Sequence, residues 1–452
     1  MGDEKMVQIK LPKDVTWIIE ELREAGYEAY AVGGCVRDTL LNRIPGDWDI
    51  TTSASPWEVK KLFRRTVDTG LQHGTVTVML HHTGYEVTTY RIDGKYEDGR
   101  HPKEVIFTKS LSEDLKRRDF TINAMAYNEE SGIVDKFHGM LDLERKIIRC
   151  VGNAEERFGE DALRMLRAIR FAAQLGFTIE EQTEAAIIKL AETLKKVSRE
   201  RIQIELNKLL LSVYPEWIKG VYQTGLSPYA LPNTEEFSKK EVQDKIIFML
   251  NVLPANLILR WAGFLSFCGK AEEAENVLRG LKFDNHTILF VSKLVEYLPQ
   301  EAEPEEIKIR CALYEMGEEI YQYYLKLKQA EILAEQEMLR QKEEQELEKR
   351  KELMEKGVVE ELVVEETEGM KQQRERQRRL EETEELYHKI KERGDCISLK
   401  MLAVTGKDLM EEGIPSGERI GKLLNQMLYQ VLCDPSANKK EILLKSIRES
   451  EP

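Results

Sequence analysis

The sequence contains few cysteines and no long apolar run, and these absences exclude several classes of protein. Its six cysteines are spread over 452 residues without a CxxC pair or a Cys/His cluster, which disfavours a zinc site and a disulfide framework. No 18 consecutive residues are apolar, and residues 1–15 lack the apolar segment of a signal peptide. We therefore expect a cytoplasmic protein that does not associate with a membrane.

The sequence also lacks an excess of positive charge. Its 67 Lys and Arg residues stand against 81 Asp and Glu residues, and the net charge of −14 argues against a protein that coats nucleic acid through bulk charge. Residues 1–210 are nearly balanced, with 32 basic and 35 acidic residues. RNA binding by this chain should therefore depend on a local basic groove and weaken strongly with salt.

Residues 1–155 combine short β-branched runs with short helical patterns and frequent glycine, which is typical of a small mixed β-sheet with helices. The pattern predicts strands over residues 28–34, 47–53, 74–80, 85–92 and 147–152. It predicts helices over residues 36–41, 56–64 and 122–127. The fold class of this part is therefore α+β.

From residue 156 onward, apolar residues recur every three or four positions, which predicts that the remainder is all-α. Amphipathic helices are expected over residues 156–177, 181–197 and 199–212. Composition then changes sharply, because residues 331–393 hold 20 acidic and 14 basic residues with only a weak apolar seam at Leu333, Met338, Leu347 and Leu353. This segment is interpreted as a protruding antiparallel helical hairpin with solvated faces. The alternative is an arm that contacts a long substrate or a second subunit.

Two glycines, Gly33 and Gly34, lie between a predicted strand and a predicted helix in VGGCVRD, residues 32–38. Without a Cβ, their backbone lets phosphate oxygens approach the amide N–H groups at the start of a helix. Arg37, on the first turn, could add a positive charge to a triphosphate. A plain turn is the alternative, since the motif alone is weak.

Three carboxylates suggest a divalent cation. In DWDI, residues 47–50, alternation along a strand would place Asp47 and Asp49 on one face, where their repulsion calls for a cation such as Mg²⁺. Glu86 stands among β-branched and aromatic residues of a later strand, where an unpaired buried charge would be costly. A shared Mg²⁺ would satisfy all three acids. A solitary DxD pair is otherwise a surface feature.

KRRDFTINAMAYN, residues 116–128, places Arg117, Arg118 and Asp119 close to Asn123. Guanidinium and amide groups suit contacts with phosphate and ribose hydroxyls. The alternative is a helix start with Asp119 as its cap.

In EDALRMLRAIRF, residues 160–171, Asp161 and Arg164 are three positions apart and would be adjacent on one helix face, followed by Arg167 and Arg170. An i,i+3 salt bridge is one interpretation. The other is a hydrogen-bond template, in which the carboxylate accepts from the exocyclic amine of cytosine or adenine and the guanidinium donates to ring acceptors. Uracil and guanine present a carbonyl at that position.

Together, VGGCVRD, DWDI, RRDFTINAMAYN and EDALRMLRAIRFAAQLGF resemble the motifs of the bacterial class II tRNA nucleotidyltransferases, the CCA-adding enzymes of the polymerase-beta-like superfamily. The resemblance is clear over residues 20–215, and LAVTGKDLMEEGIPSGERIGKLL is similar to the family's tRNA-gripping tail. It implies a nucleotidyltransferase catalytic head over 1–155, a nucleotide-selecting neck over 156–215, a body over 216–330, an inserted arm over 331–395 and a tRNA-contacting tail over 396–452.

The resemblance also implies roles for the residues above. Gly33, Gly34 and Arg37 would hold the triphosphate of CTP or ATP, and Asp47 and Asp49 would bind two Mg²⁺ ions with Glu86 as the third acid. Arg118, Asp119 and Asn123 would meet phosphate and ribose. Asp161 and Arg164 would select C and then A, with Arg167 and Arg170 on the phosphates. The partners implied are tRNA, CTP and ATP.

Three alternatives stay open. The first is an enzyme that adds only the terminal A and works beside a CC-adding partner. CC-adding relatives lack a flexible loop that is intact here at residues 91–107, which favours either full CCA addition or addition of the terminal A. Poly(A) synthesis is disfavoured because no GRRF-like basic segment occurs where GLQHGTVTVML stands. A non-catalytic RNA-binding scaffold would give no reason to keep clustered carboxylates. The sequence does not distinguish a monomer from a homodimer.

Overall fold

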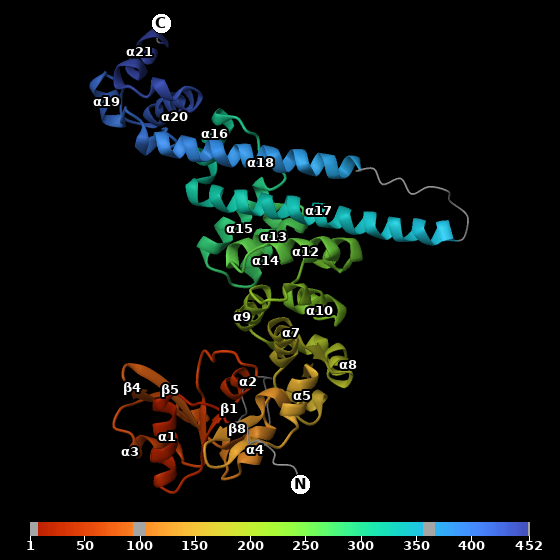
Figure 1. The fold of residues 1–452 in the computed structure, drawn as a ribbon. Helices are drawn as coiled ribbons and strands as arrows, with labels where there is room; N and C mark the ends of the chain where they lie inside the picture. The colour runs from red at the N-terminus through yellow and green to blue at the C-terminus, as the bar shows by residue number, and fades with distance from the viewer. Residues whose placement is uncertain (1–7, 94–104, 356–366, 451–452) are drawn as a thin grey trace. The chain divides into compact units, whose positions relative to one another are not determined.

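A computed structural model describes residues 8–93, 105–355 and 367–450, and the chain divides into two compact units, Met1–Ser238 and Lys239–Pro452 (Figure 1). This division falls within the expected body segment 216–330, and the finer boundaries between head, neck, body, arm and tail stay predictions. Within the described ranges, no helix is both long and apolar enough to cross a membrane.

The first unit is built on a mixed sheet. Among the described residues its strand order is β3-β4-β5-β2-β1-β8-β9, and only the β2–β5 pair is parallel. The strands are β1 (Ala29–Val32), β2 (Ile50–Thr52), β3 (Thr66–Gly70), β4 (Thr75–Leu80), β5 (Thr83–Thr89), β8 (Met125–Asn128) and β9 (Gly132–Asp135). In the registers Ala31↔Ile50 and Ile50↔Val87, three fully buried side chains line up across β1, β2 and β5. The small mixed sheet expected from the sequence is confirmed.

Short helices cover this sheet and carry the chain between its strands. They are α1 (Lys13–Glu24), α2 (Gly34–Leu40), α3 (Pro56–Leu62), α4 (Leu111–Lys116) and α5 (Gly139–Arg145). Helix α1 buries Val15, Ile18, Ile19 and Leu22, an i, i+3, i+4, i+7 pattern. The Ser55 capping box and Pro56 fix the start of α3. Two small ribbons complete this part, β6 (Arg91–Asp93) with β7 (Val105–Phe107) and β10 (Ile147–Ile148) with β11 (Thr178–Ile179).

The helix predicted over residues 122–127 is wrong. Residues Thr121–Asn123 form one 3₁₀ turn, and Met125–Asn128 form strand β8, which pairs with both β1 and β9. A segment of six residues is too short for periodicity to separate helix from strand. Here two neighbouring strands provide hydrogen-bond partners, and the Asn128 amide donates to the Ala29 carbonyl, so pairing decides the structure.

The rest of the first unit is helical, as predicted, with α6 (Ala154–Glu160), α7 (Leu163–Leu175), α8 (Glu181–Leu190), α9 (Arg199–Leu210), α10 (Ile218–Gln223) and α11 (Ser227–Ala230). The single helix predicted over 156–177 is instead two helices. The backbone becomes extended at Asp161 (φ −141°, ψ 103°), and the second helix ends at Leu175, where Gly176 follows with φ +69°. Helix α7 buries Leu163, Leu166 and Ile169 and packs against α9.

The second unit is all-α. Its helices are α12 (Lys240–Val252), α13 (Leu257–Leu265), α14 (Ala271–Gly280), α15 (Asn285–Tyr297), α16 (Glu306–Met316), α17 (Glu318–Glu355), α18 (Glu368–Arg393), α19 (Gly406–Glu411), α20 (Glu418–Cys433) and α21 (Lys440–Ser450). Around α19 to α21, the core of the C-terminal segment includes Val404, Leu409, Val431 and Leu443, all nearly inaccessible to solvent.

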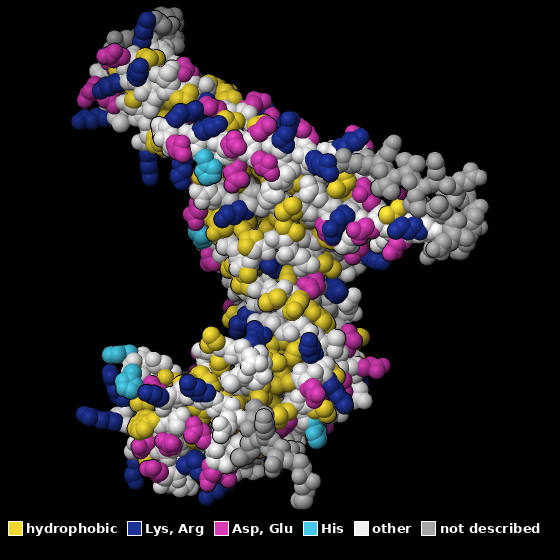
Figure 2. Space-filling view, viewed as in Figure 1, with side chains coloured by type: hydrophobic (Ala, Val, Ile, Leu, Met, Phe, Trp, Pro, Cys, Tyr) yellow, Lys and Arg dark blue, Asp and Glu magenta, His cyan; other side chains and the backbone are white. Residues whose placement is uncertain are grey.

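Helices α17 and α18 form the antiparallel pair that the charge pattern predicts (Figure 1). The Lys391 ammonium lies 2.5 Å from Glu318, and the Gln329 amide donates to Gln377 over 2.9 Å. Figure 2 shows acidic and basic side chains interspersed along both helices. Helix α17 begins at Glu318, 13 residues before the change in composition at residue 331. Of the expected seam, Leu333 is 38% exposed and Met338 and Leu347 are partly buried, while Leu353 lies outside the residues whose side chains are described. The helices instead bury an apolar stretch nearer the start of α17 and the end of α18, including Tyr321, Leu327, Ile332, Leu380, Tyr387 and Ile390.

Candidate functional site

The turn between β1 and α2 is built around Gly33. This residue has φ +81°, which favours glycine, and a Cβ added there would lie 2.7 Å from Nη1 of Arg118. Its N–H donates to the Met125 carbonyl of β8. Gly34 begins α2, and a Cβ there would lie at an ordinary 3.7 Å from Nη2 of Arg37. The structure therefore brings the predicted glycines together with both predicted arginines.

Strand β2 begins at Ile50, so the predicted strand over 47–53 is wrong at residues 47–49, and strand alternation does not position the two aspartates. The Asp49 carbonyl nevertheless accepts from the Val32 N–H, and this bond holds the segment beside the end of β1. Both side chains are exposed. Desolvation by the surrounding protein raises the pKa of Asp49, Arg118 opposes the shift, and the Asp47 carboxylate adds to it.

Glu86 lies on β5 opposite Thr77 of β4 and is exposed, so the prediction that burial forces a partner on it is wrong. Its position still ties it to the aspartates. Partial desolvation, followed by the charges of Asp49 and Asp47, raises the pKa of Glu86. The charges of the three carboxylates therefore interact at a solvent-accessible place.

These acids do not form a complete metal-ligand set. Among the described residues, no three His, Cys, Asp or Glu side chains converge closely enough to hold an ion. Mg²⁺ usually binds proteins through one or two carboxylates and keeps water and substrate phosphates as its other ligands. Exposed oxygen donors whose charges repel one another fit such a partial site, because a divalent cation relieves that repulsion.

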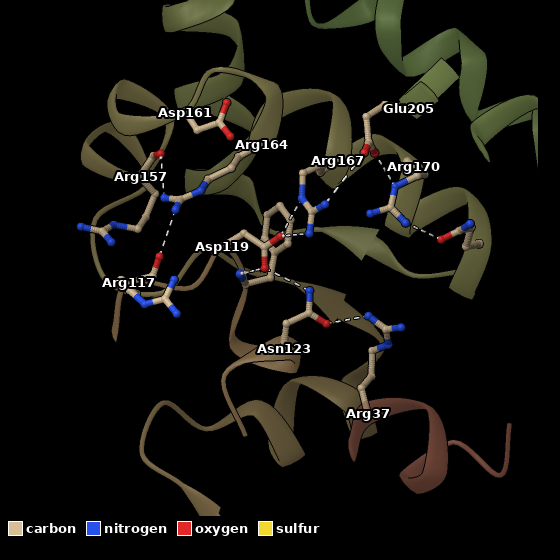
Figure 3. A network of polar contacts seen from close by, with 12 residues as sticks. Arg37, Arg117, Asp119, Asn123, Arg157, Asp161, Arg164, Arg167, Arg170 and Glu205 are labelled. Atoms are coloured by element: carbon tan, nitrogen blue, oxygen red, sulfur yellow. Dashed lines mark hydrogen bonds and ion pairs between the residues drawn. The ribbon is translucent and has the colours of Figure 1, made fainter. Parts of the chain in front are cut away.

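A chain of polar contacts connects α2, the segment after α4 and α7 (Figure 3). Arg37 Nη1 donates to Asn123 Oδ1 over 2.6 Å, and Asn123 Nδ2 donates to Asp119 Oδ1 over 3.0 Å. Arg167 Nε and Nη2 both donate to Asp119 Oδ2, at 2.8 and 2.6 Å. Burial alone raises the pKa of Asp119, but Arg167 and the Asn123 amide outweigh it and hold that pKa well below its usual range. Four predicted residues thus form one network, in which Asp119 does not cap a helix.

The structure adds three residues that the sequence analysis missed. Phe171 lies among guanidinium groups, with the Cζ atoms of Arg37 and Arg170 at 5.0 and 3.8 Å from its ring centroid. Glu205 of α9 accepts from Arg170 Nε over 2.5 Å. Asp114, fully buried, lies 2.8 Å from Arg117 and 3.7 Å from Arg118. Only Asp114 had a sequence signal, because it stands three and four positions before those arginines on a helix.

Arg170 was expected among phosphate contacts. It is 6% exposed, and besides the bond to Glu205 its Nη1 donates to Gln174 Oε1 over 2.7 Å. In this structure Arg170 is therefore a buried residue that packs on Phe171 beside the network.

Asp161 and Arg164 do not pair with each other, because α6 ends before Asp161 and α7 begins after it. Asp161 Oδ2 lies 2.7 Å from Arg201 Nη2, and Asp161 Oδ1 accepts from the Leu163 N–H over 3.1 Å. Arg164 donates to the carbonyls of Arg157 and Arg117, at 3.1 and 3.0 Å, and to Glu160 over 2.6 Å. The predicted i,i+3 salt bridge is wrong, and each group is oriented by different partners. Figure 3 shows Arg164 in contact with Arg157 and Arg117, with no contact drawn between Arg164 and Asp161.

Comparisons with known proteins cover most of the chain. Residues 29–149 match the family model described as the poly A polymerase head domain, residues 176–238 match a probable RNA and SrmB-binding site of polymerase A, and residues 337–447 match a tRNA nucleotidyltransferase domain 2. A CCA-adding enzyme of Lactiplantibacillus plantarum is 52% identical over 53% of this chain and 57% of its own length. The CCA-adding enzyme of Levilactobacillus brevis is 36% identical over 96% of both chains.

Solved structures agree in fold. The crystal structure of the Bacillus stearothermophilus CCA-adding enzyme in complex with CTP has a TM-score of 0.75 at 31% identity and spans 98% of this chain and 99% of that one. A Thermotoga maritima CCA-adding enzyme complexed with tRNA shares the fold at a TM-score of 0.61 and 21% identity, over 99% of this chain and 97% of that one. With 36% identity over nearly the whole of one such enzyme, the chain belongs to the CCA-adding enzyme family of nucleotidyltransferases.

Proposed function

We propose that this nucleotidyltransferase adds the 3′-terminal CCA to tRNA, by transferring CMP, CMP and AMP in sequence from CTP and ATP. The observation that carries the proposal is the placement of three exposed, mutually repelling carboxylates beside the Gly33 turn and the Arg118 guanidinium. An acidic group that needs cations, next to a glycine turn that admits phosphate, suits a nucleotidyl transfer centre. The full-length similarity to CCA-adding enzymes supports the choice of product.

Asp47 and Asp49 would hold Mg²⁺, with Glu86 beside them. Bound there, the ions would lower the pKa of the attacking 3′-hydroxyl and neutralise charge on the triphosphate and the leaving pyrophosphate. The protein itself supplies the complementary positive charge. Arg118 lies against the glycine turn, where a triphosphate has room to approach the backbone, and Arg37 stands on the first turn of α2.

Asp119 and Asn123 would hold the arginines of the site in place. Asn123 binds Arg37, 86 residues away in the sequence, and Asp119 binds Arg167, 48 residues away. Because Asn123 also binds Asp119, the two guanidinium groups are fixed relative to each other. Groups that are oriented before substrate arrives need little reorganisation when it binds. This network therefore supports precise placement of the nucleotide.

Base selection is proposed to rest on Asp161 and Arg164. The carboxylate would accept from the exocyclic amine that cytosine and adenine share, and the guanidinium would donate to ring acceptors. Two backbone carbonyls and Glu160 fix the plane of the Arg164 guanidinium. A site built to pair with an amine rejects a base that presents a carbonyl there, because two acceptors would then face each other.

The reaction is tested with tRNA transcripts that end before CCA, after C and after CC, each incubated with Mg²⁺ and labelled CTP or ATP. CTP should be incorporated into the first two transcripts and ATP into the third. Incorporation of ATP alone, into the third transcript only, would assign the chain to the A-adding enzymes. Long homopolymeric A tails would indicate poly(A) synthesis, and no incorporation on any transcript would favour an RNA-binding scaffold.

The template is tested with Asp161→Ala. Discrimination of CTP and ATP against UTP and GTP should fall more than the affinity for triphosphate does, because the change removes the acceptor for the amine and leaves the arginines of the network. Glu155→Ala, on the neighbouring α6, is the matched control, since Glu155 is half exposed and pairs with Lys189. Unchanged selectivity in Asp161→Ala would remove this role.

A further inference from the structure

Asp161 is oriented by a residue of another helix. Its two carboxylate oxygens have separate partners, the Leu163 N–H at 3.1 Å for Oδ1 and Arg201 Nη2 at 2.7 Å for Oδ2. Arg201 lies on α9, 40 residues further along the chain. The side chains of Asp161 and Arg201 are only 17% and 22% exposed. The ion pair therefore connects α9 to the junction between α6 and α7 in a mostly enclosed place.

The other terminal nitrogen of Arg201 is left without a partner. Among the described residues, Arg201 Nη1 is one of the buried side-chain nitrogens for which no hydrogen bond is present. Leaving a buried donor unsatisfied costs about 1–3 kcal/mol. The ion pair with Asp161 uses only one of the two terminal nitrogens of Arg201, and the other does not add to stability. A donor left unpaired at a functional site is instead available for an acceptor that arrives with substrate.

We propose that Arg201 is a positioning residue for base selection, which orients the Asp161 carboxylate toward the amine of the incoming base. The χ2 angle of an aspartate otherwise takes a broad range of values, so the carboxylate plane is not fixed by the side chain itself. With one lone pair of Oδ2 taken by Arg201 and one of Oδ1 by the Leu163 N–H, the remaining lone pairs point in fixed directions. The inference rests on the proposed role of Asp161 in base selection.

The test is Arg201→Gln, with kcat/KM measured for CTP and for UTP on a tRNA transcript that ends before CCA. The ratio of the two values should fall about tenfold, which is the effect of losing one hydrogen bond to a charged group. Arg199→Gln is the matched control, because Arg199 lies on the same helix and its Nη1 donates to the Tyr229 carbonyl. That variant should keep the wild-type ratio.

Asp161→Ala and the double variant separate the two proposals. If Arg201 acts through Asp161, Arg201→Gln should have no further effect on the ratio in the Asp161→Ala background. An equal effect in both backgrounds would overturn the inference. If the CTP/UTP ratio falls in Asp161→Ala but not in Arg201→Gln, the inference is overturned and the proposed function is left intact. No fall in Asp161→Ala would overturn the template itself.

Arg201→Lys provides a second variant if Arg201→Gln is not recovered folded. Lysine keeps the positive charge but replaces the planar fork with a single mobile ammonium group. Its CTP/UTP ratio should lie between those of the wild type and Asp161→Ala. A wild-type ratio would overturn the positioning role.

Discussion

Asp119 provides a sharp test of the polar network, through the variant Asp119→Asn. The carboxylate is 8% exposed and accepts four hydrogen bonds, from the Phe120 N–H, the Asn123 amide and two nitrogens of Arg167. Asparagine keeps the shape of the side chain but loses the charge. One of its two terminal atoms becomes an NH₂ donor, and that donor has to face other donors. Arg167 would then keep its charge in the site without its anion.

The size of the effect follows from burial. Removing one partner of a buried ion pair costs about 3–5 kcal/mol. Because the Arg167 side chain is 33% exposed, water solvates part of its charge, and the expected loss in the free energy of unfolding is about 2–4 kcal/mol. In a unit of this size that is a fall in Tm of roughly 4–16 °C. Differential scanning calorimetry measures it. Glu155→Gln is the control, because its ion pair with Lys189 is exposed on both sides and should shift the transition little.

The pH dependence checks the cause. Because the pKa of Asp119 is held below that of the unfolded chain, its contribution to stability is fully present above the ordinary aspartate pKa of about 4 and is lost as pH falls below it. The stability difference between wild type and Asp119→Asn should therefore be constant from about pH 5 to pH 8. A difference below about 1 kcal/mol, or one that changes across that range, would refute the assignment.

Other variants test the remaining parts of the site. Asp49→Asn should abolish incorporation without lowering Tm in the presence of EDTA, since it removes a carboxylate whose ionisation its surroundings disfavour. Mg²⁺ should raise the Tm of the wild type and leave that of Asp49→Asn unchanged; an equal rise in both would show that the ion binds elsewhere. Gly33→Ala should raise KM for CTP and destabilise by about 1–2 kcal/mol, because φ is +81° and the new Cβ would displace Arg118, whereas Gly46→Ala, with nothing within 4 Å, should match wild type. Glu205→Gln should lower Tm by several degrees, because it leaves a buried guanidinium of α7 without its anion; an unchanged Tm would contradict that pairing.

Much of the fold could be predicted from local pattern. The Gly33 turn, the start of α3 and the helices after residue 180 each depend on residues within one turn of one another. Strand β8 could not be predicted in the same way, because hydrogen bonds to β1 and β9 decide its structure. The start of α17 was missed for a related reason. Its first turns pack against other helices and have ordinary composition, so the change in charge after residue 330 does not mark the beginning of the helix.

The candidate site was predictable as a set of residues but not as a set of contacts. The motifs named Arg37, Asp119, Asn123 and Arg167 without indicating that these would bind one another, because their partners lie 86 and 48 residues apart in the chain. Glu205 stands in an ordinary amphipathic helix and carries no sequence signal. Contacts of this kind depend on how helices pack, which periodicity does not determine.

The interruption of the helix at Asp161 has the largest consequence for the proposed function. A continuous helix would have joined Asp161 to Arg164, so that a change in either would disturb the other. Because the backbone is extended at Asp161, the carboxylate is bound by α9, and the guanidinium is bound by Glu160 and two carbonyls. Acceptor and donor are therefore oriented independently. In the proposed base-reading template, a substitution of Asp161 or of Arg164 should therefore leave the other group in place.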